Sequence, residues 1–301
     1  MINLDINFLK KTIIISICSR SFNRGLLNLL NSISKNSILS GFKTIILIVI
    51  NNKEKISNSQ NKEIKNLLKK KFFKIIYEGR EGVSYARNKS LNLMKKIKFD
   101  YGCFLDDDCV IKKNYFEENL LFIKKNKCDV VTGPQINISK KIHHKIFERN
   151  FDHKKKLAWA STNNVFFKKK IITNKLNFSE KVTRFGFGED QLFFLNISKK
   201  GYIIIWNKNS KVYETKKKQK EKFNWFVNRN LRYGLTGKLI DYEFYGNKVG
   251  FFVNLFKILI NIIFSLLSIS KILSSPTQNT YFFMAYILRS IGRFLCIFLK
   301  N

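Results

Sequence analysis

The sequence predicts an α/β fold, with a sheet of mainly parallel strands, that continues into an apolar helical appendage. In the first half of the chain, short apolar runs alternate with amphipathic stretches, which is the pattern of successive βαβ units. Near residue 249 the composition changes, and two strongly apolar stretches follow. We therefore divide the chain into an α/β domain (1–215), a basic and aromatic helical extension (216–248) and a pair of amphipathic helices (249–301).

The individual elements follow from the apolar runs and their boundaries. Four runs predict strands: Thr12–Cys18, Thr44–Ile50, Phe72–Tyr77 and Tyr101–Leu105. Two amphipathic stretches predict helices: Gly25–Ile33, and a second one that Ser84 caps and that runs to about Lys98. Because ligands bind beyond the carboxyl ends of parallel strands, we expect functional residues where these strands end.

Three adjacent carboxylates, Asp106, Asp107 and Asp108, follow the fourth predicted strand. In an extended segment, alternation places Asp106 and Asp108 on one side and Asp107 on the other. The three charges repel one another, and a divalent cation removes that cost. Carboxylate oxygens suit Mg²⁺ or Mn²⁺, which keep open positions for phosphate oxygens. The segment thus predicts a metal site for a diphosphate, with an ordinary acidic turn as the alternative.

A second carboxylate pair, Glu189 and Asp190, comes after the glycine-rich segment Phe185–Gly188 and before an apolar run, Leu192–Ile197. Carboxylates at the start of a helix also interact well with the helix dipole, so simple capping is one interpretation. The metal site upstream favours a second interpretation. A reaction in which a hydroxyl displaces a nucleoside diphosphate needs a general base, and this pair can supply it.

The two apolar stretches, Gly250–Ser270 and Tyr281–Leu299, carry polar residues at helical spacing. On the first stretch they are Asn254, Lys257, Asn261, Ser265, Ser268 and Lys271, and on the second Arg289, Arg293, Cys296 and Lys300. Neither stretch has ~20 uninterrupted apolar residues, the length that spans a bilayer. We therefore expect helices that lie in the membrane interface with their basic stripes toward anionic lipid. A membrane-spanning hairpin and a soluble core hairpin are the alternatives.

The 301-residue chain is strongly basic, with a formal net charge of +35. Such a charge suits a polyanion, either nucleic acid or a membrane surface, although the codon bias of an AT-rich genome explains the many lysines equally well. The sequence has no RNP-type aromatic string and no zinc finger, so we expect no specific nucleic-acid partner. The five cysteines are scattered without a CxxC motif, and Met1–Lys11 lacks the order of a signal peptide. Both features predict a reducing compartment inside the cell.

Taken in order, these motifs resemble glycosyltransferase family 2 over about residues 12–234. Ile15–Ser19 and Phe22–Arg24 are similar to the family's first strand and nucleotide loop, Val83–Asn88 resembles its "ARN" helix, and Phe104–Asp108 resembles its DxD metal site. Val131–Pro134 and Ser161–Phe167 resemble its acceptor-side strands, and Gly188–Asp190 resembles its ED motif. Val212–Glu214, followed by Trp225, Arg229, Arg232 and Gly234, is similar to a subgroup that makes bacterial exopolysaccharides and related surface glycans.

The resemblance implies a GT-A fold, the Rossmann-like fold of nucleotide-diphospho-sugar transferases. It also implies an inverting glycosyltransferase that uses Mn²⁺ or Mg²⁺ and moves a sugar to a hydroxyl from a nucleotide-sugar donor, a UDP-sugar. The implied acceptor is a membrane-proximal or lipid-linked glycan at the cytoplasmic face of the inner or plasma membrane. A non-catalytic, membrane-tethered partner in a glycan assembly complex and a polyanion-binding protein are the alternatives.

The resemblance also implies roles for particular residues. Asp190 would deprotonate the acceptor hydroxyl, with Glu189 beside it in the catalytic pair. The metal ligands would be Asp108, Asp106 and Glu214. The residues that bind the nucleotide sugar would be Ser19, Arg24, Asn51, Arg87, Asp106, Asp107, Arg229 and Arg232. Those that bind the acceptor would be Asn163, Asn164 and Phe187.

Two positions depart from the family pattern. The family usually has Asp where this chain has Asn51, so a contact to the nucleoside base loses a charge. A third metal ligand, often His in GT-A enzymes, would align near Glu214, where a carboxylate would have to serve.

Overall fold

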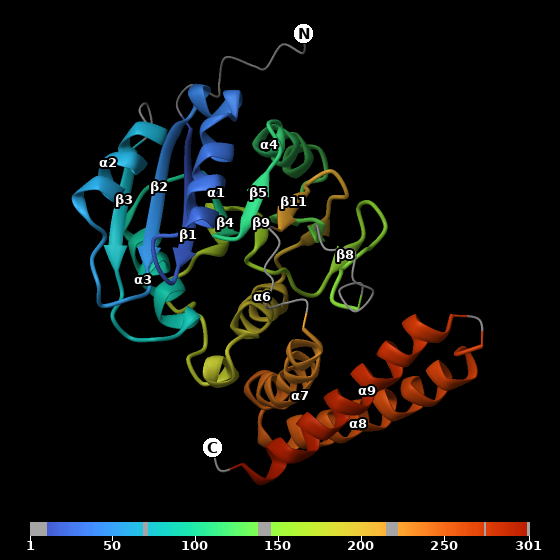
Figure 1. Cartoon of the computed structure of the whole chain (residues 1–301). Coiled ribbons are helices and arrows are strands. Elements are labelled where there is room, and N and C mark those ends of the chain that lie inside the picture. The colour runs from blue at the N-terminus through green and yellow to red at the C-terminus, as the bar shows by residue number, and fades with distance from the viewer. Residues whose placement is uncertain (1–10, 69–71, 138–145, 215–221, 274, 300–301) are drawn as a thin grey trace. The chain divides into compact units, whose positions relative to one another are not determined.

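The computed structural model describes residues 11–68, 72–137, 146–214, 222–273 and 275–299 (Figure 1). The start of the chain and the first residues of the predicted extension, 1–10 and 216–221, lie outside this part. The chain folds into two units. The first contains residues 1–136, 149–178 and 193–215, and the second contains residues 137–148, 179–192 and 216–301. The second unit therefore joins the extension to the C-terminal helices and includes two segments that the sequence boundaries assign to the α/β domain.

An eight-stranded sheet forms the centre of the first unit, with the strand order β3-β2-β1-β4-β9-β6-β10-β8. Its strands are β1 (Thr12–Ser19), β2 (Lys43–Ile50), β3 (Phe72–Tyr77), β4 (Tyr101–Asp106), β6 (Val130–Thr132), β8 (Lys156–Leu157), β9 (Asn164–Lys168) and β10 (Ile204–Trp206). The first four strands in this order are parallel, whereas β9 runs antiparallel to both β4 and β6. The four predicted strands are thus confirmed, each to within one residue at either end.

A smaller sheet has the order β5-β11-β7. Its strands are β5 (Cys109–Ile111), β7 (Gln135–Asn137) and β11 (Val212–Glu214). Because β5 begins directly after the three carboxylates, the segment Asp106–Asp108 connects the large sheet to the small one.

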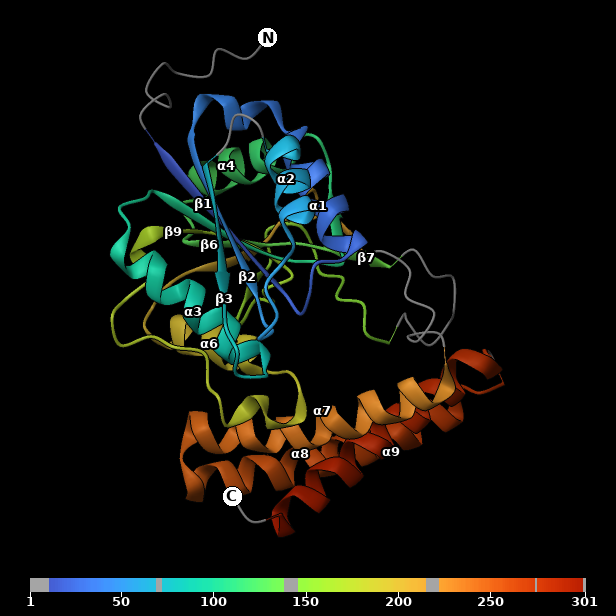
Figure 2. The same ribbon diagram turned by 60° about the vertical axis from the view of Figure 1, so that its left-hand side comes forward.

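Helices cover both faces of the large sheet (Figure 2). One face carries α1 (Arg24–Ser34), α2 (Asn58–Leu67) and α4 (Tyr115–Lys125), and the other carries α3 (Val83–Lys96) and α6 (Glu189–Lys199). Three short 3-10 helices complete the connections: η2 (Ser37–Gly41), η3 (Lys169–Ile171) and η4 (Val182–Phe185). Apolar side chains on both faces of the sheet are consistent with its near-continuous apolar strands.

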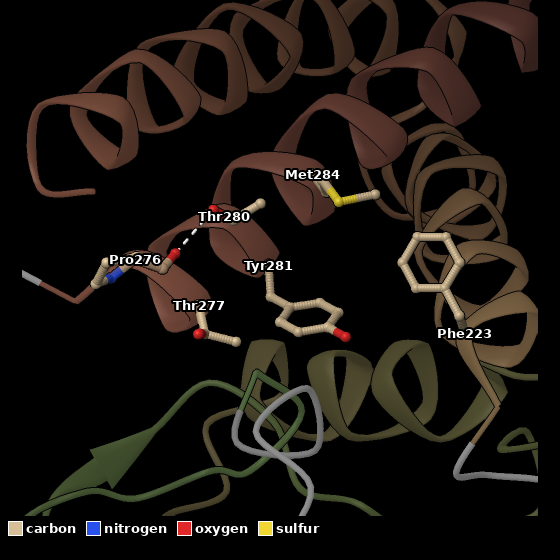
Figure 3. A pocket seen from close by; sticks show the side chains of 6 residues that line it. All are labelled: Phe223, Pro276, Thr277, Thr280, Tyr281 and Met284. Atoms are coloured by element: carbon tan, nitrogen blue, oxygen red, sulfur yellow. Dashed lines mark hydrogen bonds between the residues drawn. The ribbon is translucent and has the colours of Figure 1, made fainter. Parts of the chain in front are cut away.

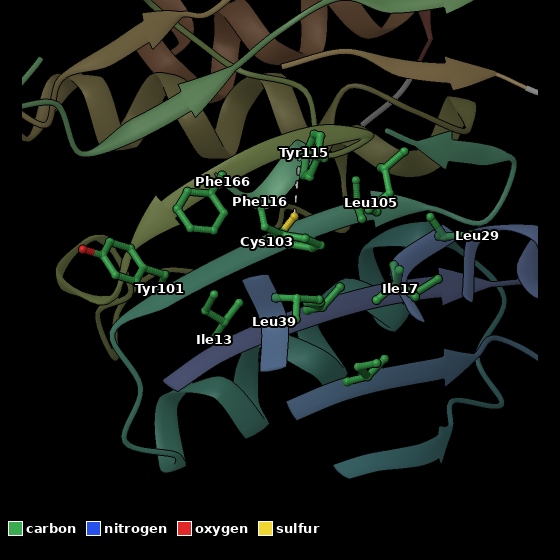
Figure 4. Close-up of a cluster of buried hydrophobic side chains, with 14 of the residues drawn as sticks. Ile13, Ile17, Leu29, Leu39, Tyr101, Cys103, Leu105, Tyr115, Phe116 and Phe166 are labelled. Atoms are coloured by element: carbon green, nitrogen blue, oxygen red, sulfur yellow. Dashed lines mark hydrogen bonds between the residues drawn. The ribbon is translucent and has the colours of Figure 1, made fainter. Parts of the chain in front are cut away.

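The side chains of each central strand alternate between these two helical layers. Ile13 and Ile17 of β1 and Leu105 of β4 belong to the core under α1 and α4 (Figure 4). Ile14 of β1 and Phe104 of β4 belong to the core on the α3 and α6 side. This period of two ends with Asp106, which lies on the α3 side, and Asp107 and Asp108 form the turn that follows β4.

The start of α3 differs from the prediction that Ser84 caps it. The capping position belongs to Gly82, and Ser84 is buried in the first turn of the helix. Gly82 has a φ of 134°, in a region that side-chain-bearing residues rarely adopt. The loop conformation before the helix therefore decides its first residue, and the hydroxyl of Ser84 does not.

Three long helices dominate the second unit: α7 (Phe223–Tyr245), α8 (Asn247–Ser270) and α9 (Pro276–Phe298). Each packs against the other two, and η4 packs on α7. The predicted basic stripes exist, but the prediction that they face lipid is wrong. Lys257 of α8 and Arg293 of α9 both bind Asp241 of α7, at 2.5 and 2.8 Å, so these two cations point into the unit. Lys271 is exposed, and Lys300 lies outside the described residues.

Candidate active site

Several predicted site residues meet at the carboxyl edge of the large sheet. β1 pairs in parallel with β2 and β4, and the register places Cys18 opposite Asp106 and Ser19 opposite Ile50. The residues at and just beyond these strand ends form the carboxyl-edge cluster: Ser19, Asn51, Asp106, Asp107 and Asp108. All of them lie in the first unit. The strand ends thus bring together residues that are up to 89 positions apart in the chain.

Asp106 points toward the α3 layer. Its Oδ1 accepts a hydrogen bond from the Arg87 guanidinium at 3.2 Å, and 37% of its side chain is exposed, against 9% for Arg87. Arg87 is therefore buried behind a carboxylate that reaches the surface. An arginine in this position fixes the orientation of Asp106 and offsets part of its charge.

Asp107 points to the opposite layer and is held by the first loop. Its Oδ2 accepts hydrogen bonds from Ser19 Oγ at 2.5 Å and from Asn23 Nδ2 at 2.8 Å. The side-chain Oδ1 of Asn23 in turn caps α1 by accepting from the Leu26 amide at 3.0 Å. Sequence reasoning missed this role of Asn23, although an Asn directly before a helix is a standard capping signal.

Asn51 joins the end of β2 to the loop before α3. Its Nδ2 donates to the carbonyl oxygens of Glu78 and Arg80, at 3.0 and 2.7 Å, and its Oδ1 accepts from the Gly82 amide at 3.2 Å. An ionised Asp has no donor and could not make the first two bonds. Asn at this position therefore fixes the loop before α3 in a way that Asp could not.

The loop that Asn51 supports carries a second ion pair. Arg80 Nε donates to Glu78 Oε1 at 3.0 Å, and the guanidinium lies 4.4 Å from the centre of the Tyr85 ring. These hydrogen bonds from Arg80 hold the pKa of the buried Glu78 carboxyl below its ordinary value. Sequence reasoning did not single out this pair.

Glu214 lies next to Asp108 through strand pairing. β11 pairs antiparallel with β5 so that Glu214 faces Cys109, the residue after Asp108. Both carboxylates are buried, and Gln135 Nε2 donates to Glu214 Oε2 at 3.0 Å. Gln135 also accepts from Asn163 Nδ2, so one predicted acceptor residue connects to one predicted metal ligand. Gln135 itself was not predicted, because its contact with Glu214 spans 79 positions of the chain.

The carboxylates fit a metal that a substrate helps to bind. Within the described ranges, no three His, Cys, Asp or Glu side chains converge as a complete metal-binding set. Mg²⁺ commonly uses only one or two carboxylates and takes its other oxygens from water and substrate phosphates. Asp106 and Asp108, with Glu214 beside Asp108, offer hard oxygen ligands of this kind.

Asn164 has a different role from the predicted one. Its side chain is fully buried, accepts from the Tyr115 hydroxyl at 2.7 Å, and donates to the carbonyl oxygens of Pro134 and Ser210 at 3.2 and 2.6 Å. A buried amide whose groups are all bonded within the protein cannot also bind an acceptor. Asn164 thus fixes the start of β9 to the segments that carry Tyr115, Pro134 and Ser210. The prediction that Asn164 binds the acceptor is therefore corrected.

The Cys18 thiol at the sheet edge is a poor nucleophile. Desolvation raises the pKa of the Cys18 thiol to about 12, although Arg87 opposes the shift. At neutral pH the thiol is therefore protonated, and the thiolate is the reactive form. The reactive groups at this edge of the sheet are therefore carboxylates and amides.

The second carboxylate pair belongs to the second unit. Glu189 and Asp190 occupy the first turn of α6, where the helix dipole favours negative charge. Asp190 Oδ1 accepts from the Gln191 amide at 2.7 Å. Gly188, just before them, has a φ of 101°, and a Cβ there would lie 2.2 Å from Thr236 Cγ2 of α7. Position 188 therefore requires glycine for two reasons: its positive φ, and the lack of room for a Cβ against α7.

Phe187 and the predicted arginines of α7 lie together in the second unit. The Arg229 guanidinium lies 4.5 Å from the centre of the Phe187 ring and donates to the Tyr233 hydroxyl at 3.3 Å. Arg232 is exposed and passes beside Gly186. Arg24, in the first unit, is exposed at the first position of α1. Three predicted residues, Phe187, Arg229 and Arg232, therefore share one surface of α7 and its adjoining loop.

A separate hollow of about 390 Å³ lies between the first turns of α7 and α9 (Figure 3). Its lining residues are Phe223, Pro276, Thr277, Thr280, Tyr281 and Met284. All six side chains are uncharged, and the Thr280 hydroxyl donates to the Pro276 carbonyl at 2.8 Å. This hollow therefore lacks the charges that a diphosphate or a metal would need.

The model of the family described as Glycosyl transferase family 2 matches residues 12–188, more than half of the chain. The chain belongs to glycosyl transferase family 2. The match contains the whole carboxyl-edge cluster and ends directly before Glu189. No curated protein matches the chain.

Solved structures share the GT-A fold of this family. TarS from S. aureus (residues 1–349) has a TM-score of 0.53 at 15% identity, over 77% of this chain and 65% of that one. Its complex with UDP-GlcNAc has a TM-score of 0.51 at 17% identity, over 77% and 66%. The mannosyltransferase PcManGT from Pyrobaculum calidifontis, in complex with GDP-Man and Mn²⁺, has a TM-score of 0.60 at 10% identity, over 95% and 88%. The chain thus spans slightly less than two thirds of these TarS structures, and at these identities the likeness shows the fold.

Proposed function

We propose that this family 2 chain is an inverting glycosyltransferase that moves a sugar from a nucleotide-sugar donor, a UDP-sugar, to a hydroxyl. The observation that carries the proposal is the carboxyl-edge cluster, which lies at the strand ends of a parallel sheet inside the matched region. Similar structures contain UDP-GlcNAc in one case and GDP-Man with Mn²⁺ in another, which supports a nucleotide-sugar donor.

Donor binding in this proposal uses the residues that the sequence motifs indicate. Ser19, Arg24 and Asn51 line the nucleoside pocket, and Asp107 faces the ribose or the donor sugar. Asp108, helped by Asp106 and Glu214, holds Mn²⁺ or Mg²⁺. When bound, the cation neutralises the charge that builds on the departing diphosphate. Arg229 and Arg232 suit the same leaving group, because a guanidinium binds phosphate oxygens in a bidentate manner.

The chemical step needs a base for the acceptor. We assign this role to Asp190, with Glu189 beside it, on the strength of the sequence motif. The carboxylate takes the proton of the acceptor hydroxyl, and the oxygen electron pair forms the new bond to the anomeric carbon. The bond from that carbon to the diphosphate oxygen breaks on the opposite side, so the configuration inverts. Asn163 and Phe187 contribute to the acceptor side.

The acceptor in this proposal is a membrane-proximal or lipid-linked glycan, used at the cytoplasmic face of the membrane. All five cysteines are free thiols, which suits a reducing compartment. By length and composition, the apolar helices α8 and α9 could cross or bind a membrane.

The base assignment is tested by separating binding from turnover. We expect Asp190→Asn to keep the thermal stabilisation that a UDP-sugar and Mn²⁺ give the wild type, since ligands that bind the native state raise its apparent stability. Turnover should fall by about 10²–10⁴-fold, the usual contribution of a general base. Asp152→Asn, at a carboxylate whose side chain is 95% exposed, is the matched control and should change neither property. Normal turnover by Asp190→Asn would remove the assignment.

A further inference from the structure

The outer surface of α8 and α9 is strongly apolar. Among the described residues, most of the large hydrophobic side chains that are exposed lie between Val249 and Leu299. Phe252, Phe256 and Phe298 are 69, 62 and 70% exposed. Single exposed hydrophobic residues are ordinary, but a continuous apolar face on two adjacent helices indicates a partner.

The inner surface of the same helices is polar or small. The residues that α8 buries are Gly250, Asn254, Ser265 and Ser268, and those that α9 buries are Ala285, Ser290, Gly292 and Cys296. A helix of a water-soluble bundle has the reverse arrangement, with its apolar side chains inside. Small and polar residues between helices are typical of helices that pack within lipid.

Small residues also allow backbones to touch. A Cβ added at Gly292 of α9 would lie 2.2 Å from the Leu231 carbonyl oxygen, and one added at Gly234 of α7 would lie 2.2 Å from the Arg289 carbonyl oxygen. α7 and α9 therefore pack backbone against backbone. Packing of this kind gives stability through close contact and does not need buried apolar side chains.

Three basic side chains of the stripes, Lys257, Arg289 and Arg293, are used within the unit, whereas Lys271 is exposed. Lys257 and Arg293 bind Asp241, Arg293 also donates to Asn254 Oδ1 at 2.9 Å, and Arg289 donates to Asn230 Oδ1 at 2.9 Å. Arg293 is only 12% exposed. These cations do not point to anionic headgroups, so any attraction of this surface to a membrane is mainly hydrophobic.

Length alone permits these helices to cross a bilayer, but their packing opposes it. α8 has 24 residues and spans about 36 Å, more than the ~30 Å of the hydrocarbon core. However, α7 accompanies α9 from the Phe226–Tyr281 ring contact to the Asp241–Arg293 pair, about 22 Å of α7. A crossing hairpin would therefore carry α7 into the hydrocarbon.

The composition of α7 excludes it from that environment. Arg232 and Glu243 of α7 are exposed, and η4 and the Gly188 segment pack on this helix. An arginine at the centre of a bilayer costs roughly 2.5–3.5 kcal/mol on insertion scales. α7 lies along the α8–α9 pair (Figure 2), and its charged residues place it on the water side of that pair.

From these observations we infer that α8 and α9 lie flat in one leaflet of a lipid bilayer. Their outer faces contact acyl chains, and α7 covers their inner faces on the water side. The binding is hydrophobic and does not need anionic lipid. This arrangement goes beyond the proposed sugar transfer and does not depend on it, since an inactive chain would bind in the same way.

Flotation of the full chain with vesicles of pure phosphatidylcholine in about 1 M salt tests the binding, because such salt screens surface charges to within about 3 Å. We expect the wild type to remain with the vesicles and the double variant Phe252→Asp, Phe256→Asp to lose roughly a hundredfold in partitioning. Phe72→Asp, at a side chain 65% exposed in β3, is the matched control and should float like the wild type. Binding that requires anionic lipid and is lost in salt would overturn the inference.

Labelling with a membrane-impermeant maleimide tests the orientation. Lys248→Cys, at the start of α8, and Lys271→Cys, in the turn before α9, should both be labelled on intact vesicles, since both ends of α8 stay at one surface. Labelling of Lys271→Cys only after the vesicles are opened would show a crossing hairpin and contradict the flat arrangement. A lipid-free dimer that the double variant dissociates, without vesicle binding by the wild type, would assign the apolar face to a second copy instead.

Discussion

At the scale of single residues, Asn51 shows how a departure from the family pattern fits its local structure. The usual Asp would present a carboxylate to the two carbonyl oxygens of Glu78 and Arg80, to which Asn51 donates. The sequence showed the departure but not its reason, because the carbonyls belong to a loop about 30 residues away. The contact between Gln135 and Glu214, which are 79 positions apart, was hidden for the same reason. Contacts of this kind depend on which strands pair, and single-sequence patterns do not give the pairing.

Asp107 gives a prediction at this scale. Its carboxylate accepts from Ser19 and Asn23, so Asp107→Ala removes two charge-assisted hydrogen bonds, although both donors keep a bond to the Ser21 carbonyl oxygen. We expect a loss of about 1–3 kcal/mol in the free energy of unfolding, measured by urea denaturation. Asp107→Asn keeps one oxygen acceptor and should lose less. Wild-type stability in Asp107→Ala would show that the first loop does not depend on this carboxylate.

At the scale of elements, the four parallel strands β1 to β4 were predictable because each is a short apolar run that ends at polar residues. The short strands β8 and β10 were not predicted. The direction of the polar stripes on α8 and α9 was not predictable either. Helical spacing shows that Lys257 and Arg293 share a face with their neighbours, but it cannot say what that face meets. The partner is Asp241 on α7, a single carboxylate whose position the sequence pattern does not reveal.

The loop between β3 and α3 gives a prediction at this scale. The Glu78 pKa lies below its ordinary value of 4.5, mainly through hydrogen bonds from Arg80. The pair therefore stabilises the fold above that pH, and the contribution is lost as the pH falls through the lowered pKa. We expect Glu78→Gln to melt below the wild type at neutral pH and the two melting temperatures to converge in acid. Glu81→Gln, on the same loop, is the control, and a gap for Glu78→Gln that is independent of pH would contradict the assignment.

At the scale of the whole molecule, the family, the GT-A fold and the position of the three carboxylates could be predicted from ordered motifs. The grouping of the chain into two units could not. The second unit takes residues 137–148 and 179–192 from the middle of the α/β sequence and joins them to the C-terminal helices. Such a grouping arises from contacts like those of Gly188 with α7, which no boundary in composition marks.

We propose that the carboxyl-edge cluster holds a metal that assists departure of a nucleoside diphosphate. The most direct measurement is the release of nucleoside diphosphate from a panel of nucleotide sugars, with Mn²⁺, with Mg²⁺ and with a chelator. We expect release from at least one donor only with metal, and a loss on the order of 10²–10³-fold in Asp108→Asn, comparable to the removal of one group that stabilises transition-state charge. Release that continues undiminished in the chelator and in Asp108→Asn would contradict the claim.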